Sequence, residues 1–114
     1  MTYEEPEPEK KLWFCTVLNL GCGLDTRVYR VDPPATVCWY DIDLPGVIAL
    51  RRRLFAERAG AHTIAASVTY PHLVDAVPGD TPVLVVARGW RRIGVMMLRR
   101  ISQHFPSGEM VFDG

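Results

Sequence analysis

Two glycines and one aspartate are the residues whose types and spacing best fit ligand chemistry. Gly21 and Gly23 follow the apolar run 16–20, and Asp43 lies at the carboxyl end of the next apolar run. Glycine has no Cβ, so the chain can turn sharply there and a ligand can approach the backbone closely. A carboxylate at the end of the second strand can accept hydrogen bonds from both hydroxyl groups of a ribose. The pattern therefore predicts a ligand that contains a nucleoside.

The same residues also allow a purely structural interpretation. In it, the glycines form only a turn, and Asp43 only caps the helix expected to begin near Pro45. The placement of the acid at the end of the next strand favours a ligand site over this alternative. The helix that follows the glycines would also point its first amide groups at such a ligand.

The type of nucleoside follows from the residue at one position of the loop. Dinucleotide-binding loops carry a third glycine, which lets the following helix pack closely against the strand. Thr26 stands at that position in this chain. S-adenosylmethionine contains no pyrophosphate and needs no third glycine, so it is the favoured cofactor. NAD or another nucleotide remains the alternative.

Apolar segments and turn residues alternate along the chain as in α/β folds. Short apolar runs predict strands over residues 16–20, 36–40, 62–66, 82–87 and 109–112. The segments between them predict helical elements over 25–31, 45–59, 71–76 and 93–105. Short connections in such an alternation imply right-handed crossovers and a mostly parallel sheet. All 114 residues are expected to belong to a single domain.

The two longest helices should each bury one face. In the helix over 45–59, the predicted apolar face holds Val47, Ile48, Leu54 and Phe55. In the helix over 93–105, apolar residues recur at positions 93, 97, 101 and 105. The arginines at 51–53 are interpreted as a solvated helix face, and the pair Met96–Met97 as part of the core.

Two stretches of the chain resemble a known family. Residues 17–30, with the motif Gly-x-Gly-x-Asp-Thr-Arg, and residues 39–45, a strand with Trp39 that ends in Asp-Leu-Pro, are similar to the leucine carboxyl methyltransferase-like family. This family includes O-methyltransferases of the polyketide-synthesis type. The likeness continues through most of the chain after residue 15. It implies a class I methyltransferase with a Rossmann-like sheet of strand order 3-2-1-4-5.

The resemblance also implies the roles of particular residues. By resemblance, Gly21, Cys22 and Gly23 would hold the methionine end of S-adenosylmethionine, and Asp43 would bind its ribose. Ser67 and Val68 would lie close to the adenine. The methyl acceptor would be a carboxyl or hydroxyl group of a small molecule. No catalytic base is assigned, because the family's reaction relies mainly on positioning the two reactants.

The chain also departs from the family pattern. Arg88 precedes Gly89 where a glutamate is usual, and the family's N-terminal helical region and last strands are missing. We therefore expect a partial domain with a flexible leader over residues 1–12 and little activity of its own, and a non-catalytic remnant stays as an alternative. The uncovered strand 109–112 predicts self-association through an exposed edge.

Composition excludes several classes of function. The 13 basic and 13 acidic residues balance, so no global charge attracts nucleic acid or an anionic membrane. No apolar run approaches the roughly 20 residues of a membrane-spanning helix. The N-terminus has no secretory pattern, so a cytoplasmic location is expected.

The cysteines and histidines show no metal-binding spacing. Cys15, Cys22 and Cys38 form no Cys-x-x-Cys pair, and the three histidines form no His-x-His or His-x-x-x-His pair. Reduced and mostly buried thiols are therefore expected, and no metal. Cys22 lies near a predicted helix N-terminus, which would lower its pKa.

Overall fold

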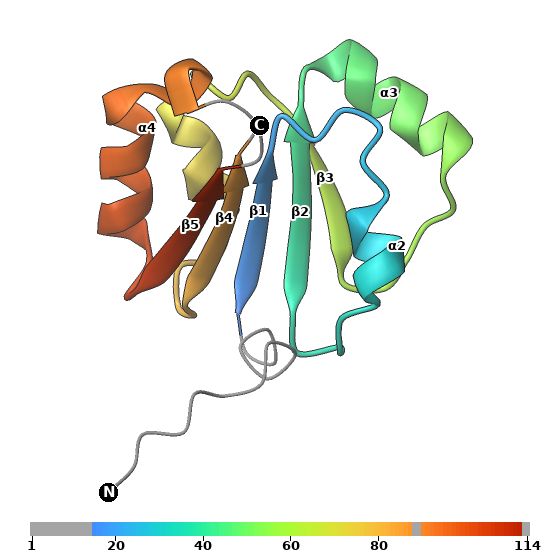
Figure 1. Ribbon diagram of the computed structural model, residues 1–114, viewed down its shortest axis with the longest axis horizontal. Coiled ribbons are helices and arrows are strands. Elements are labelled where there is room, and N and C mark those ends of the chain that lie inside the picture. The colour runs from blue at the N-terminus through green and yellow to red at the C-terminus, as the bar shows by residue number, and fades with distance from the viewer. Residues whose placement is uncertain (1–14, 88–89, 113–114) are drawn as a thin grey trace, which may run out of the picture.

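Five parallel strands form one sheet in the order β3-β2-β1-β4-β5, as predicted (Figure 1). The computed structural model describes residues 15–87 and 90–112. The predicted leader and Arg88 lie outside the described residues. The strands are β1 (Thr16–Leu20), β2 (Cys38–Asp43), β3 (Ala61–Ala65), β4 (Val83–Ala87) and β5 (Gly108–Phe112).

Strand β1 forms the centre of the sheet, and its two buried polar side chains, Thr16 and Asn19, both have hydrogen-bond partners. All five of its residues are buried. It pairs with β2 on one side and with β4 on the other, and Leu20 lies opposite Ile42 and Ala87. This register brings the ends of β1 and β2 level, so the loop after β1 begins beside Asp43.

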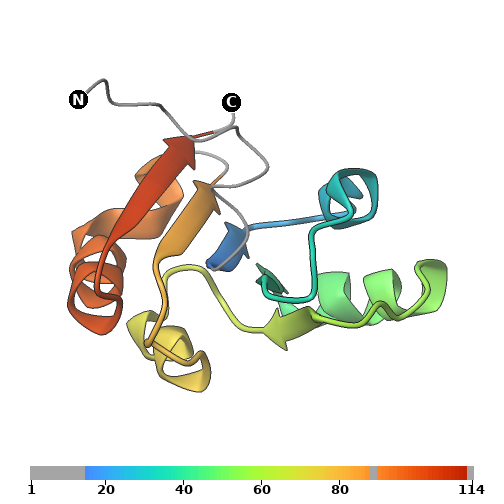
Figure 2. The same ribbon diagram turned by 90° about the horizontal axis from the view of Figure 1, so that it is seen from below.

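Four helical elements cover the two faces of the sheet. They are α2 (Arg27–Val31), α3 (Pro45–Leu54), the 3-10 helix η1 (Pro71–Ala76) and α4 (Trp90–His104). One core cluster joins η1 and α4 to the strands through Leu18, Ile42 and Val85, and a second joins α2 through Val17 and Val28. Figure 2 shows α2 and η1 on opposite sides of the curved row of strands.

Helix α3 is shorter than predicted. It begins at Pro45, as expected, but ends at Leu54 rather than at Ala59, because Phe55 takes an extended backbone with φ −117° and ψ 139°. The Phe55 ring then lies over the guanidinium of Arg51, 5.1 Å from its central carbon. Leu54 is 57% exposed, so its predicted burial is wrong. Gly60, with φ +80°, makes the turn into β3 instead of ending the helix.

The apolar spacing of α4 is confirmed, with one interruption. The side chains at positions 93, 97, 101 and 105 are all buried. Gly94 has φ 75° and ψ 162°, so the element consists of two helical pieces joined at that residue. Met96 is 64% exposed and its predicted burial is wrong, because it lies about 100° around the helix from Met97, away from the face that the residues at 93, 97 and 101 bury. Within the described residues, no helix has the length and apolar character to cross a membrane.

Candidate functional site

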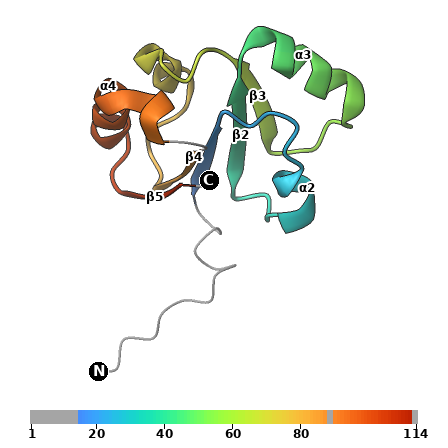
Figure 3. The same cartoon turned by 45° about the horizontal axis from the view of Figure 1, so that its top comes forward.

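The predicted ligand loop crosses the carboxyl end of β2. Figure 3 shows the segment after β1 passing over that end of the sheet on its way to α2. The amides of Gly21 and Cys22 both donate to the carbonyl of Ile42, at 2.8 and 3.1 Å. The amide of Gly23 donates to Oδ2 of Asp43 at 2.8 Å. The fold thus brings the glycines and the acid into direct contact.

The carboxylate of Asp43 is held by backbone amides. Its Oδ2 accepts from Gly23, and its Oδ1 accepts from the amide of Leu44 at 2.7 Å. Leu44 is itself the N-cap residue of α3 and has no side-chain cap among the described residues, so Asp43 does not cap the helix in the usual way. A carboxylate has about four lone-pair positions, so two remain for other donors.

The loop after β3 lies beside Asp43. The amide of Ala66 donates to the Asp43 carbonyl at 2.9 Å, which places Ser67 and Val68 at the same edge of the sheet. The Ser67 hydroxyl is within 2.7 Å of the Thr69 hydroxyl in a local turn. Val68 packs partly against the core cluster beneath η1. All the predicted site residues therefore lie on neighbouring strand ends.

The backbone at the two glycines is open to a ligand. Gly21 and Gly23 have φ values of +70° and +52°, a region that other residues rarely adopt. A Cβ at either position would meet no atom within 4 Å of the described protein. Any other residue at these two positions would therefore have a strained backbone. The outer side of the loop at both glycines is unobstructed.

Two electrostatic expectations about this loop are wrong. The Cys22 thiol is fully buried, and burial, followed by the charge of Asp41, raises its pKa to about 12. Helix α2 begins only at Arg27, whose amide donates to Oδ1 of Asp25 at 2.9 Å. This carboxylate, and not a ligand, is the partner of the first amide of α2 in the described part of the chain.

A buried ion pair, which the sequence patterns did not reveal, lies below the loop. Asp41 and Arg51 are each only 3% exposed, and Nη2 of Arg51 is 2.8 Å from Oδ2 of Asp41. Oδ1 of Asp41 accepts from Asn19 Nδ2 at 2.9 Å and from Trp39 Nε1 at 3.1 Å. Burial raises the pKa of Asp41 above its ordinary value, although these three partners pull it down.

Arg51 connects this pair to the glycine loop. Its Nη1 donates to the carbonyls of Gly23 and Asp25, at 3.0 and 2.7 Å. The prediction that Arg51 belongs to a solvated face is therefore wrong, whereas the two arginines that follow it are exposed. One signal pointed to the pair: Asp41 lies inside a buried strand, where a carboxylate requires a partner.

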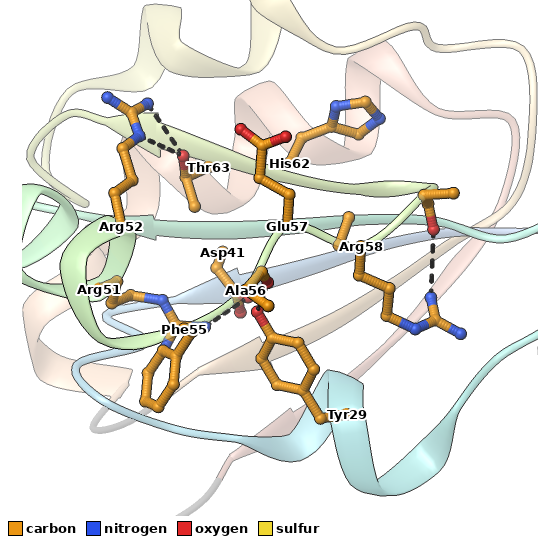
Figure 4. Close-up of a pocket in the computed structure, with 12 residues that line it drawn as sticks. Tyr29, Asp41, Arg51, Arg52, Phe55, Ala56, Glu57, Arg58, His62 and Thr63 are labelled. Atoms are coloured by element: carbon orange, nitrogen blue, oxygen red, sulfur yellow. Dashed lines mark hydrogen bonds and ion pairs between the residues drawn. The ribbon is translucent and has the colours of Figure 1, made fainter.

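A separate groove of ≈ 590 Å³ lies between α2, the end of α3 and β3. Its lining includes Tyr29, Arg52, Arg58 and His62, and Figure 4 shows Phe55 beside Arg51 at one side of it. The groove contains none of the six predicted site residues and lies along β3 rather than at the strand ends. It is therefore distinct from the predicted ligand site.

The chain matches a family of known proteins over most of the described sheet. Residues 11–87 match the family model for leucine carboxyl methyltransferase. The chain belongs to this family. The region that matches the family model ends at Ala87, the last residue of β4 and the residue directly before Arg88.

Individual relatives agree with the family match. The tetracenomycin polyketide synthesis O-methyltransferase TcmP of Streptomyces glaucescens is 49% identical over an alignment of 102 positions that covers 85% of this chain and 38% of the relative. The S-adenosyl-L-methionine-dependent methyltransferase dpfgK of Gibberella zeae is 35% identical over an alignment of 115 positions, gaps included, that covers 86% of this chain and 38% of the relative. The chain thus spans well under half the length of these two relatives.

Proposed function

We propose that this chain binds S-adenosylmethionine at the carboxyl ends of β1, β2 and β3, and that it serves methyl transfer to an oxygen of a small molecule. The acceptor group is a carboxyl or a hydroxyl. The observation that carries the proposal is the 2.8 Å hydrogen bond from the Gly23 amide to Asp43, which joins the ligand loop to the ribose-binding acid. The relatives' names, an O-methyltransferase and a methyltransferase dependent on S-adenosyl-L-methionine, support it.

The residues present fit this cofactor. The outer side of Gly21 and Gly23 is open, and Asp43 keeps two acceptor positions for the ribose hydroxyl groups. Ser67 and Val68 directly follow Ala66, whose amide donates to the Asp43 carbonyl, so they can contact the adenine. Cys22 contributes only its backbone, because its side chain is fully buried.

The geometry favours S-adenosylmethionine over a dinucleotide. A pyrophosphate needs backbone amides that are free to donate to it. The amides of Gly21 and Cys22 are used by Ile42, and that of Gly23 by Asp43. Asp25 adds a negative charge at the start of α2. The loop therefore offers a cofactor close contact, while the amides of Gly21, Cys22 and Gly23 already have acceptors within the protein.

The chemistry requires little from the protein beyond binding. When bound, S-adenosylmethionine supplies an electrophilic methyl group on its sulfonium. The residues of this chain orient the nucleoside through Asp43 and shape the approach to the reacting methyl through the glycine backbone. Positioning alone can provide several kcal/mol of the barrier reduction in such a reaction.

Calorimetry with S-adenosylhomocysteine and NAD, titrated separately, tests the proposal. We expect S-adenosylhomocysteine to bind, and NAD to bind at least about tenfold more weakly, because its pyrophosphate would lose hydrogen bonds to water without gaining amide donors. The two ligands share the adenosine group, which makes NAD a matched control. Tighter binding of NAD, or no binding of either ligand, would contradict the assignment.

The free edge of β5 supports self-association as a second part of the proposal. β5 pairs with β4, and no other strand of the described chain pairs with its far side. Val111 and Phe112 are 49% and 46% exposed. Light scattering should therefore show a mass that increases with concentration, and Val111→Lys should reduce it, because a charge on an edge strand opposes pairing. A monodisperse monomer at all concentrations would refute this part.

A further inference from the structure

The backbone of Gly23 is held from two sides. Its amide donates to Asp43 at 2.8 Å, and its carbonyl accepts from Arg51 at 3.0 Å. The first partner comes from the end of β2 and the second from the second turn of α3. Because the φ value of Gly23 is +52°, the loop leaves the ordinary backbone regions at the residue that both partners hold.

Arg51 makes these contacts as part of a three-acceptor arrangement. One terminal nitrogen donates to the carbonyls of Gly23 and Asp25, and the other donates to Asp41. A planar guanidinium can serve three acceptors in fixed directions, whereas a lysine ammonium cannot reproduce this geometry from one point. Asp41 in turn is held by Asn19 and Trp39, so the guanidinium is anchored to the sheet.

The two loop carbonyls satisfy N–H donors of the buried guanidinium that Asp41 leaves without a partner. Pairing with Asp41 already neutralises the charge of Arg51. The bonds to the loop have a further consequence: they set where the Gly23 carbonyl points, and hence where its amide meets Asp43. The orientation of the Asp43 carboxylate thus depends on Arg51 through one glycine.

We propose that Arg51 is a positioning residue of the cofactor site: without touching the cofactor, it holds the glycine loop and, through Gly23, the acid that binds the ribose. This inference rests on the proposed function of the loop and Asp43. It assigns to Arg51 an effect on affinity in addition to its effect on folding.

The test compares Arg51→Lys with Arg52→Lys, its exposed neighbour on the same helix, in the full chain. Calorimetry measures the affinity for S-adenosylhomocysteine, and residue-resolved hydrogen exchange measures the protection of amides 21–25. We expect Arg51→Lys to bind about tenfold more weakly, with faster exchange at these amides, because hydrogen bonds from a charged donor are lost. Arg52→Lys should match the natural protein in both measurements.

A stability control separates positioning from a general loss of structure. Val37→Ala removes buried side-chain volume just before the opposite end of β2, in a core cluster that includes no residue of the loop 21–25. It should lower the melting temperature yet leave the affinity and the exchange of amides 21–25 unchanged. If Val37→Ala weakens binding as much as Arg51→Lys at an equal loss of stability, the positioning role is refuted.

Two further outcomes remain distinguishable. If Arg51→Lys does not fold, the neutral double variant Asp41→Asn/Arg51→Gln removes both charges, and the same weaker binding and faster loop exchange are expected. If the natural protein itself binds no S-adenosylhomocysteine, the proposed function fails, and the cofactor-positioning role fails with it. Unchanged affinity and unchanged loop exchange in Arg51→Lys would overturn the inference while leaving the proposed function intact.

Discussion

Replacing Arg51 by methionine is expected to lower the free energy of unfolding by about 3–5 kcal/mol, because it leaves the buried carboxylate of Asp41 without its charged partner. The two residues are each 3% exposed, and Nη2 of Arg51 lies 2.8 Å from Oδ2 of Asp41. Urea denaturation measures the loss. Arg53→Met, on the exposed side of α3, is the matched control and should change stability by no more than about 0.5 kcal/mol.

Removing both charges should be less harmful than removing one. In Asp41→Asn/Arg51→Met, the amide oxygen can still accept from Asn19 and Trp39, and no uncompensated charge stays buried. We therefore expect the double variant to recover roughly half or more of the loss seen in Arg51→Met. Additive losses in this double-mutant cycle would show that the two side chains do not interact as the geometry indicates.

The dependence of the protein's stability on pH is a second way to measure the effect of burying Asp41. Burial raises its pKa in the folded protein above the ordinary value of 3.8. The folded protein therefore holds this proton more tightly than the unfolded chain does, so ionisation of Asp41 lowers stability as the pH rises from 3.8 through the raised pKa. Relative to Asp41→Asn, the natural protein should gain stability as the pH falls through this range.

Replacing Asp43 by alanine is expected to weaken S-adenosylhomocysteine binding by about 1.5–3 kcal/mol, or roughly 10- to 150-fold. The substitution removes the acceptor for the ribose hydroxyl groups and also the partner of the Gly23 amide. Both losses act on the same ligand, which is why this variant should have the largest effect on affinity. Calorimetry measures it directly.

Asp43→Asn distinguishes the two contributions of this carboxylate. It keeps one oxygen acceptor, so its affinity should lie between those of the natural protein and Asp43→Ala. Asp80→Ala, at an exposed loop position, should bind normally. Equal affinity of Asp43→Ala and the natural protein would show that the nucleoside binds elsewhere.

Short local patterns were enough to predict most of the elements. The apolar run Thr16–Leu20 coincides with β1, and the turn predicted over 71–76 coincides with η1. The glycines and Asp43 were found from their types and their places in these elements. These features are encoded by neighbouring residues, since backbone freedom at glycine and side-chain alternation in a strand act over a few positions. The strand order came from the family resemblance.

The surroundings of each charged or titratable side chain, by contrast, were decided only by the tertiary structure. The sequence shows three successive arginines, and nothing local distinguishes Arg51 from the exposed pair that follows it. Its partners lie 10, 26 and 28 positions away, at Asp41, Asp25 and Gly23. The pKa of Cys22 is raised for the same reason: burial depends on which distant segments surround the thiol.

The sequence by itself determined which residues could bind a nucleoside and which elements carry them. The tertiary structure determined how those residues are held: the Gly21–Gly23 amides are turned toward β2, Asp43 is engaged by Gly23, and Arg51 joins α3 to the loop. The physical reason is that hydrogen bonds and ion pairs form only between groups within about 3–4 Å. Folding alone brings groups from separate elements to that distance.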